Sequence, residues 1–293
     1  MDSFSISQIS QFIGVKPNTI RAWERRYDAV KPDRSEGNTR YYSNSQLRRL
    51  LNIVSLREDY QISKLCSYSD KKLFELILSQ PQNGNSSEPE NYFISQLISA
   101  GIDYDEVHFE KVFAHCLLRY SVKTAYIKVV CPMMERLGLM WTSNSIHPAC
   151  EHFISNLVRQ KLLTTIDSLP PSSAKANVWM LFLPENEFHD IGLLLANYLI
   201  RLSGQKVIFL GSNVPLQSLK SAHKVIEPDN LLFFLVRNNL SKNSQNYLHQ
   251  LSTSFPKCDL FLSGNGKLIK QLQLNDKMHW LRSVDEFAKQ LKL

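Results

Sequence analysis

Residues 175–293 alternate short apolar runs with longer amphipathic ones, and this alternation restricts the fold more than any other feature. Apolar runs typical of buried strands lie at 178–183, 207–210, 231–236 and 260–262. Runs with helical spacing lie at 191–202, 216–226 and 244–255, and a closing helix is expected within 281–293. The pattern predicts a doubly wound parallel sheet of about four or five strands. Ligands of such sheets bind beyond the carboxyl ends of the strands.

One of the expected strand-to-helix turns carries a histidine between two acidic residues. The segment Glu187-Phe188-His189-Asp190-Ile191-Gly192 follows the apolar run at 178–183 and precedes the helical run at 191–202. An imidazole at this edge of a parallel sheet is placed to bind a ligand. The segment by itself leaves two interpretations open, a ligand-binding histidine and an exposed loop histidine.

Positive charge is concentrated near the N-terminus. Residues 1–57 hold ten Lys and Arg against five Asp and Glu, which gives +5 of the chain's net charge of +7. This distribution indicates a partner that is an acidic polymer.

The basic region has the pattern of two short helices around a tight turn. Ile9 and Phe12 are spaced for one buried face, Gly14 supplies the turn, and Pro17 fits the first position of the second helix. Ile20 would face inward with Trp23, while Arg21, Arg25 and Arg26 lie on other faces. The turn-rich, basic and aromatic segment 31–42 is suited to a wing on a DNA backbone, and Ser43 could cap a third helix. We therefore predict a winged helix-turn-helix; a helical hairpin with surface arginines is the alternative.

The middle of the chain is predicted to be helical. Residues 80–90 are polar and rich in helix breakers, as expected of a linker. Helical spacing follows at 91–100, 103–119, 120–139 and 147–168, and predicts a four-helix bundle. The predicted organisation is a multidomain α plus α/β protein, with domains at 1–79, 91–170 and 171–293 and a linker at 80–90.

Composition narrows the class of protein. No apolar run approaches the length of a membrane span, the first residues lack a secretory signal, and five scattered cysteines suit reduced thiols. We expect a cytoplasmic protein without a membrane partner.

The N-terminal region resembles the MerR-type DNA-binding domain over about the first 75 residues. The resemblance is carried by Ile20-Arg21-Ala22-Trp23-Glu24-Arg25-Arg26-Tyr27, followed by Pro32, Arg34, Gly37, Arg40 and Tyr42. Asp28 stands where that family usually has Gly. The resemblance implies a dimeric protein on double-stranded operator DNA, with DNA contacts from Arg21, Arg25, Arg34, Arg40 and Tyr42.

The C-terminal region resembles the cobalamin-binding domain of corrinoid proteins. The resemblance is carried by Glu187-x-His189-x-x-Gly192 and by Gly211-x-x-Val214-Pro215. It implies that His189 is the axial ligand of cobalt and that Glu187 holds the other ring nitrogen. A neutral imidazole ligates a metal through one nitrogen while a carboxylate orients the other. Glycine allows a close approach of backbone and macrocycle.

The helical region resembles CarH- and LitR-type light-responsive regulators. The resemblance is carried by Trp141, nine intervening residues and then the pair Glu151-His152. That resemblance implies that Trp141 covers the upper face of adenosylcobalamin and that Glu151 and His152 lie on the ligand side. Without this resemblance, we would interpret Trp141 as a core or capping aromatic residue and Glu151-His152 as part of a solvent-exposed helix turn.

Three positions depart from that pattern. Thr142 replaces the His that follows the Trp in CarH-type sensors, so the usual bis-His photoproduct is not expected. The Ser-x-Leu segment of the nucleotide-tail tunnel is replaced by the apolar run at 231–236, whose Phe side chains are expected to narrow the tunnel. The paired glycines beside the tail appear as Ser263-Gly264-Asn265-Gly266.

These features predict a transcriptional regulator, a repressor by resemblance, that is not an enzyme. It is expected to sense a corrinoid, adenosylcobalamin by resemblance, and light through a ligand-dependent change between dimer and tetramer. The residues expected to contact the corrinoid are Trp141, Glu151, His152, Glu187, His189, Gly192, Gly211 and Gly264. The alternatives are a regulator of the same fold that senses another tetrapyrrole or a protein partner, and a corrinoid methyl-transfer component.

Overall fold

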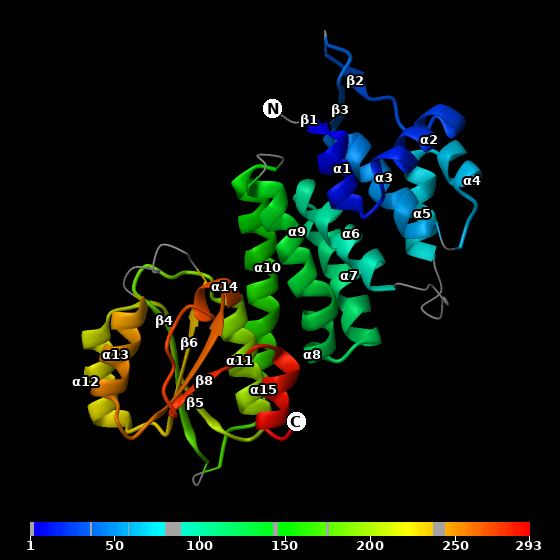
Figure 1. Ribbon diagram of the computed structural model, residues 1–293. Helices are drawn as coiled ribbons and strands as arrows, with labels where there is room; N and C mark the ends of the chain where they lie inside the picture. The colour runs from blue at the N-terminus through cyan, green and yellow to red at the C-terminus, as the bar shows by residue number, and fades with distance from the viewer. Residues whose placement is uncertain are drawn as a thin grey trace. The chain divides into compact units, whose positions relative to one another are not determined.

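The computed structural model describes residues 3–35, 37–57, 59–79, 89–142, 146–173, 176–236 and 244–293. The chain divides into two compact units, Met1–Leu157 and Val158–Leu293. Figure 1 shows the elements of each unit. Residues 80–88 of the predicted linker lie outside the described residues.

The first unit begins with a small sheet and five helices. Its strands are β1 (Ser3–Ser5), β2 (Asp33–Arg34) and β3 (Arg40–Ser43), and its helices are α1 (Ile6–Ile13), α2 (Pro17–Tyr27), α3 (Asn44–Leu56), α4 (Ile62–Ser67) and α5 (Asp70–Ser79). The strands pair antiparallel in the order β1-β3-β2.

Local sequence explains where α1, α2 and α3 begin and end. Ser5 and Gln8 form a reciprocal capping box at α1, and Ser43 forms the same arrangement at α3. Gly14 ends α1 in the left-handed conformation, with φ of 67°. Pro17 opens α2, where a missing N–H costs nothing. The predicted helix-turn-helix geometry is present.

The four predicted helices of the middle region are present, and one of them is irregular. They are α6 (Pro89–Ile102), α7 (Glu106–Arg119), the continuous run α8 (Val122–Ala125), η1 (Tyr126–Val130) and α9 (Cys131–Thr142), and α10 (Pro148–Asp167). The segment η1 is a π-helix, which the sequence pattern did not predict. Helices α6 and α10 approach closely at Gly101, since a Cβ there would lie 2.0 Å from a side-chain carbon of Ile154.

Helix α3 packs against α6 through a polar contact in the interior of the first unit. The amide of Gln96 donates to Asn52 at 3.1 Å, and the ring nitrogen Nε2 of His108 lies 3.2 Å from the Gln96 amide oxygen. Asn52, Gln96 and His108 are all buried. Buried polar groups need hydrogen-bond partners, and these three side chains supply partners to one another. The hydrogen bonds therefore fix how α3 and α6 pack together.

The second unit is a parallel sheet with helices on both faces. Its strands are β4 (Val178–Pro184), β5 (Lys206–Val214), β6 (Asn230–Leu235), β7 (Asp259–Gly264) and β8 (Met278–Trp280). Its further helices are α11 (Ile191–Leu202), α12 (Leu216–Ile226), α13 (Ser244–Ser254), α14 (Gly266–Ile269) and α15 (Val284–Gln290). The strand order is β5-β4-β6-β7-β8, with every pair parallel.

The two faces of this sheet are covered by different helices. In Figure 1, α12 and α13 lie on one face of the sheet and α11 and α15 on the other. Met180 and Phe182 of β4 belong to a cluster with Leu219 of α12 and Leu248 of α13. Trp179, on the opposite face of the same strand, contacts Phe287 of α15 with ring centroids 5.9 Å apart. The doubly wound arrangement places the chain reversal of the sheet between β4 and β6, where such folds bind ligands.

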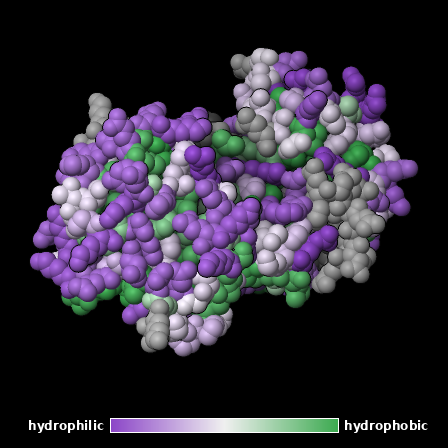
Figure 2. Space-filling view, turned by 60° about the horizontal axis from the view of Figure 1, so that its bottom comes forward, coloured by the Kyte–Doolittle hydropathy of each residue, from purple (hydrophilic) through white to green (hydrophobic). Residues whose placement is uncertain are grey.

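The surface carries hydrophobic residues only in small groups on the face shown in Figure 2, where most residues are hydrophilic. Among the helices in the described part of the chain, none has the length and apolar character needed to cross a bilayer.

Candidate functional site

Helix α2 presents a basic surface. Ile20 and Trp23 are buried against the rest of the helix-turn-helix, whereas Arg21, Arg25 and Arg26 are exposed. The guanidinium of Arg21 donates to the side-chain oxygen of Asn18 at 3.0 Å. A helix with one buried face and guanidinium groups on its exposed face is suited to a major groove.

Glu24 of α2 joins the helix to the wing strand β3. One carboxylate oxygen accepts from Arg40 Nε at 2.8 Å, and the other accepts from the hydroxyl of Tyr42. Tyr42 is 0% exposed, and the side chain of Arg40 is 27% exposed. Burial and the Glu24 carboxylate both raise the pKa of Tyr42. Of the expected DNA contacts, Tyr42 therefore differs from expectation: its enclosed side chain fixes the wing rather than reaching the surface.

The wing itself carries one exposed arginine. Arg34 is exposed, and its guanidinium contacts the side-chain oxygen of Asn38 across the turn. Asp28, the residue that replaces a family glycine, ends α2 with φ of 51°. This left-handed conformation explains the usual glycine, because only glycine adopts it without steric cost.

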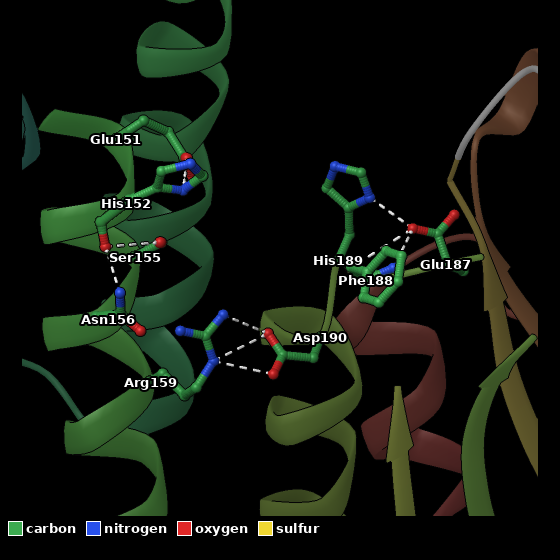
Figure 3. A network of polar contacts seen from close by, with 9 residues as sticks. All are labelled: Glu151, His152, Ser155, Asn156, Arg159, Glu187, Phe188, His189 and Asp190. Carbon is green, nitrogen blue, oxygen red and sulfur yellow. Dashed lines mark hydrogen bonds and ion pairs between the residues drawn. The ribbon is translucent and has the colours of Figure 1, made fainter. Parts of the chain in front are cut away.

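In the second unit, Glu187 and His189 lie at the carboxyl end of β4, beside β6, and therefore at the reversal point of the sheet. Glu187 Oε1 accepts from the backbone N–H groups of Phe188 at 3.0 Å and His189 at 3.2 Å, and lies 2.5 Å from His189 Nδ1 (Figure 3). Glu187 Oε2 accepts from the backbone N–H of Val236 at 3.2 Å. The carboxylate thus ties the turn to the end of β6.

The two partners differ sharply in exposure, since the side chain of Glu187 is 0% exposed and that of His189 is 53% exposed. An ionised carboxylate is an acceptor only, so Nδ1 of His189 carries the proton and donates it to Glu187. In the neutral imidazole the other nitrogen, Nε2, carries a lone pair, and this nitrogen is directed away from Glu187 (Figure 3). An exposed imidazole oriented in this way is suited to ligate a metal from one side.

The end of β5 supports the same turn. Gly211 has φ of +79°, and the pairing of β4 with β5 is irregular at this point, where Phe182 lies opposite Gly211. Two residues later, Asn213 donates its backbone N–H to the Glu187 carbonyl at 3.1 Å, and its side-chain oxygen accepts from the backbone N–H of Asn186 at 2.8 Å. Gly211 therefore shapes the strand end that holds Glu187.

At the other two candidate glycines, the space beside the Cα atom is occupied by other atoms of the protein. A Cβ at Gly192 would lie 2.8 Å from a ring carbon of Phe234, and a Cβ at Gly264 would lie 2.3 Å from the carbonyl oxygen of Leu235. Phe234 of the apolar strand thus lies directly against Gly192. His189, held by Glu187, has the donor chemistry to bind the cobalt of a corrinoid, while Phe234 occupies the space beside Gly192 of α11.

The candidates of the helical region are described in part. Trp141 and Thr142 belong to α9, but their side chains lie outside the described residues. Glu151 and His152 are in the first turns of α10, where His152 Nδ1 lies 3.1 Å from Glu151 Oε2 and the His152 side chain is 72% exposed. The backbone carbonyl of His152 accepts from the side chains of Ser155 and Asn156 (Figure 3).

Sequence reasoning left out Arg159 and gave no role to Asp190. Arg159 of α10 donates to both carboxylate oxygens of Asp190, with distances of 2.8 to 3.2 Å. The position of Asp190 next to His189 was the one feature of the sequence that could have indicated its role. Its partner, 31 residues earlier, could not be identified from spacing.

Two protein-family models match the chain. Residues 4–63 match a model described as MerR HTH family regulatory protein, and residues 94–164 match a model described as B12 binding domain. The first covers the winged helix-turn-helix and the second covers the helical bundle. These matches confirm the MerR-type resemblance of the N-terminal region and the resemblance of the helical region to a cobalamin-binding protein.

Curated proteins and a solved structure are also similar. The chain is 26% identical over 259 residues to the HTH-type transcriptional repressor CarH of Myxococcus xanthus, covering 87% of this chain and 86% of that protein. It is 28% identical over 233 residues to the HTH-type transcriptional repressor CarA of the same organism, covering 79% and 76%.

The monomethylamine corrinoid protein of Methanosarcina barkeri matches with a TM-score of 0.56 and 15% identity, over 68% of this chain and 97% of that one. This likeness concerns the fold alone, and the predicted fold class is confirmed.

Proposed function

We propose that this protein is a DNA-binding transcriptional regulator, a repressor, whose second unit senses a cobalt corrinoid through His189. One observation carries the proposal: an exposed imidazole is held by the buried carboxylate of Glu187 at the reversal point of a doubly wound sheet. A winged helix-turn-helix in the same chain supports regulation over catalysis. The similarity to CarH and CarA, both described as transcriptional repressors, agrees with this.

On the DNA side, the proposal assigns different tasks to the basic residues. Arg21, Arg25 and Arg34 are exposed and contact phosphates or base edges of an operator. Arg40 and Tyr42 hold the wing through Glu24 and so position it on the backbone. A dimer would read two half-sites.

On the ligand side, His189 would bind the cobalt of the corrinoid through Nε2, and Glu187 would keep its imidazole in the ligating tautomer. A bound corrinoid would supply a light-sensitive cobalt–carbon bond, with adenosyl as the proposed carbon ligand. Trp141, Glu151, His152 and Gly211 are proposed to line its surroundings, whereas Gly192 and Gly264 face Phe234 and Leu235 of the protein itself. The ligand regulates DNA binding by favouring one oligomeric arrangement, dimer or tetramer, over the other.

The test uses the purified full chain with hydroxocobalamin and adenosylcobalamin, kept in the dark. We expect a visible corrinoid spectrum that stays with the protein through gel filtration, and its loss in His189→Ala. His249→Ala, which changes an exposed histidine of α13, is the matched control. No retained spectrum with either corrinoid would refute the sensor and favour a regulator that uses another tetrapyrrole or a protein partner.

A second measurement separates regulation from methyl transfer, which the fold likeness to a corrinoid protein brings in as the alternative. Duplexes selected by the protein from a random-sequence pool are used in gel shifts, with and without corrinoid, before and after illumination. A corrinoid-dependent change in affinity supports the regulator. Unchanged DNA binding, together with methylation of the corrinoid by an added methylamine methyltransferase, would support the alternative.

A further inference from the structure

The turn that carries His189 is held at both ends, and its second end is held by α10. At the first end, Glu187 is bonded to the end of β6 through the backbone N–H of Val236. At the second end, the carboxylate of Asp190 receives three hydrogen bonds from Arg159 (Figure 3). His189 lies between these two anchors.

Asp190 occupies the N-cap position of α11 but does not cap it. Its side chain makes no capping hydrogen bond, and its backbone has φ of −87° and ψ of −11°. N-cap residues ordinarily have extended backbone angles, which bring a side-chain oxygen onto the first N–H groups of the helix. Aspartate is a favoured N-cap residue, but Asp190 does not have the backbone conformation of an N-cap. Both of its carboxylate oxygens instead accept hydrogen bonds from Arg159.

The Arg159–Asp190 ion pair is partly buried and has a well-defined geometry. The side chains of Arg159 and Asp190 are 30% and 18% exposed, and the guanidinium meets the carboxylate in the two-pronged geometry that fixes orientation as well as distance. The imidazole of His189 is half-exposed, so packing restrains it less than the backbone turn beneath it does.

We propose that Arg159 is a positioning residue for His189, acting by keeping Asp190 away from the N-cap of α11. Without Arg159, Asp190 rotates about ψ into the extended conformation and caps α11. That rotation moves the peptide joining His189 to Asp190 and draws the His189 ring off Glu187. The inference deepens the proposed function and rests on it for the identity of the ligand, but the positioning itself is a property of the protein alone.

The primary test therefore needs no ligand. In the full chain labelled with ¹⁵N-histidine, NMR reports whether each nitrogen of the His189 ring is protonated, once its signals are assigned by their loss in His189→Ala. We expect the intact protein to show one tautomer, protonated at Nδ1. Arg159→Ala should move the two nitrogen signals toward each other, because the Nδ1 tautomer is no longer fixed. Asp190→Asn, which keeps the capping group and removes the ion pair, should do the same.

Two further variants exclude a general loss of structure. Gln160→Ala changes an exposed neighbour on α10 and should leave the His189 signals unchanged. Arg159→Lys keeps the charge without the two-pronged contact and should give an intermediate result. Unfolding temperatures identify any variant that fails to fold. If Arg159→Ala fails to fold, the test is made with Asp190→Asn and Arg159→Lys.

The ligand arm measures the affinity for hydroxocobalamin and the nitrogen splitting in the EPR spectrum of the reduced cobalt form. With ¹⁵N-histidine, this splitting distinguishes protein imidazole from the nucleotide base of the corrinoid. Arg159→Ala should lose about tenfold or more in affinity, the usual effect of removing a group that orients a metal ligand, and should lose the histidine splitting.

Folded Arg159→Ala and Asp190→Asn with unchanged His189 signals would overturn the positioning role. Shifted signals in a protein that retains no corrinoid would uphold the positioning role and refute the sensor.

Discussion

The ring of Phe234 lies against Gly192, 2.8 Å from the place that a Cβ would take. Phe234 is on the α11 side of β6, opposite the buried Phe233, which stacks on Phe182 with centroids 5.5 Å apart. The glycine of the histidine motif is thus required by a neighbouring side chain in this chain.

Gly192→Ala tests this contact. Alanine is the better helix former by about 1 kcal/mol, yet we expect a net loss of about 1 to 2 kcal/mol, because the half-buried Phe234 ring must shift to make room for the added methyl group. Urea unfolding measures the change. In the double variant with Phe234→Ala, most of that loss should be absent. Strict additivity of the two substitutions would show that the ring and the glycine are not coupled.

Arg25→Ala should weaken binding to a random-sequence duplex. One lost phosphate contact reduces the slope of log affinity against log salt concentration by about 0.9. Fluorescence anisotropy over a salt series measures both quantities. Lys289→Ala, which removes an exposed charge on α15 of the second unit, is the control for net charge. Equal slopes for the two variants would remove Arg25 from the DNA interface.

Tyr42→Phe should affect stability more than DNA contact. The hydroxyl donates to Glu24 inside the protein, so its removal should cost about 1 kcal/mol in unfolding free energy. The loss of DNA affinity should be smaller than that of Arg25→Ala. Tyr41→Phe changes the exposed neighbour on the same strand and serves as the matched control. A Tyr42→Phe protein of normal stability that fails to bind DNA would assign Tyr42 to direct contact.

The stability of the first unit should decrease in acid because of His108. Burial lowers the pKa of this histidine below its usual 6.5, with Asp105 opposing the shift and Lys111 adding to it. The unfolded chain therefore binds the proton at higher pH than the folded chain does. The contribution is fully retained above about pH 6.5 and is lost as pH falls from there to the folded-state pKa. Below that point both states are protonated and no further loss occurs.

Denaturant titrations between about pH 8 and pH 5 measure this dependence. His108→Gln should flatten the slope in that window, whereas His115→Gln, an exposed change on the same helix, should not. A slope that survives in His108→Gln would assign the pH dependence to other groups.

Much of the fold followed from the sequence because it depends on local rules. Ser5 and Ser43 cap helices, Gly14 ends one, and Pro17 begins one, all through interactions within a few residues. The apolar runs became β4 to β7 because strands buried on both faces need continuous apolar sequence. The π-helix at Tyr126 was missed, since its hydrogen bonds differ from those of an α-helix while its apolar spacing does not.

In the candidate site, too, the sequence predicted the local contacts and not the long-range ones. Glu187 and His189 are two residues apart, so a motif could pair them, and the structure gives that pair at 2.5 Å. The motif did not indicate that Val236 and Asn213 bond to Glu187, or that Phe234 fills the space at Gly192. These contacts join three different strands and depend on their register.

The sequence by itself determined the order of a basic winged helix-turn-helix, a helical bundle and a parallel sheet, together with the histidine at the edge of that sheet. Capping, periodicity and charge are properties of neighbouring residues, and they can be read without coordinates. Only the tertiary structure decided that Tyr42 is enclosed on Glu24 and that Asp190 belongs to Arg159 instead of to its own helix. Each of these pairs joins residues distant in the chain, and which partner a carboxylate takes depends on which donors the packed fold brings within reach.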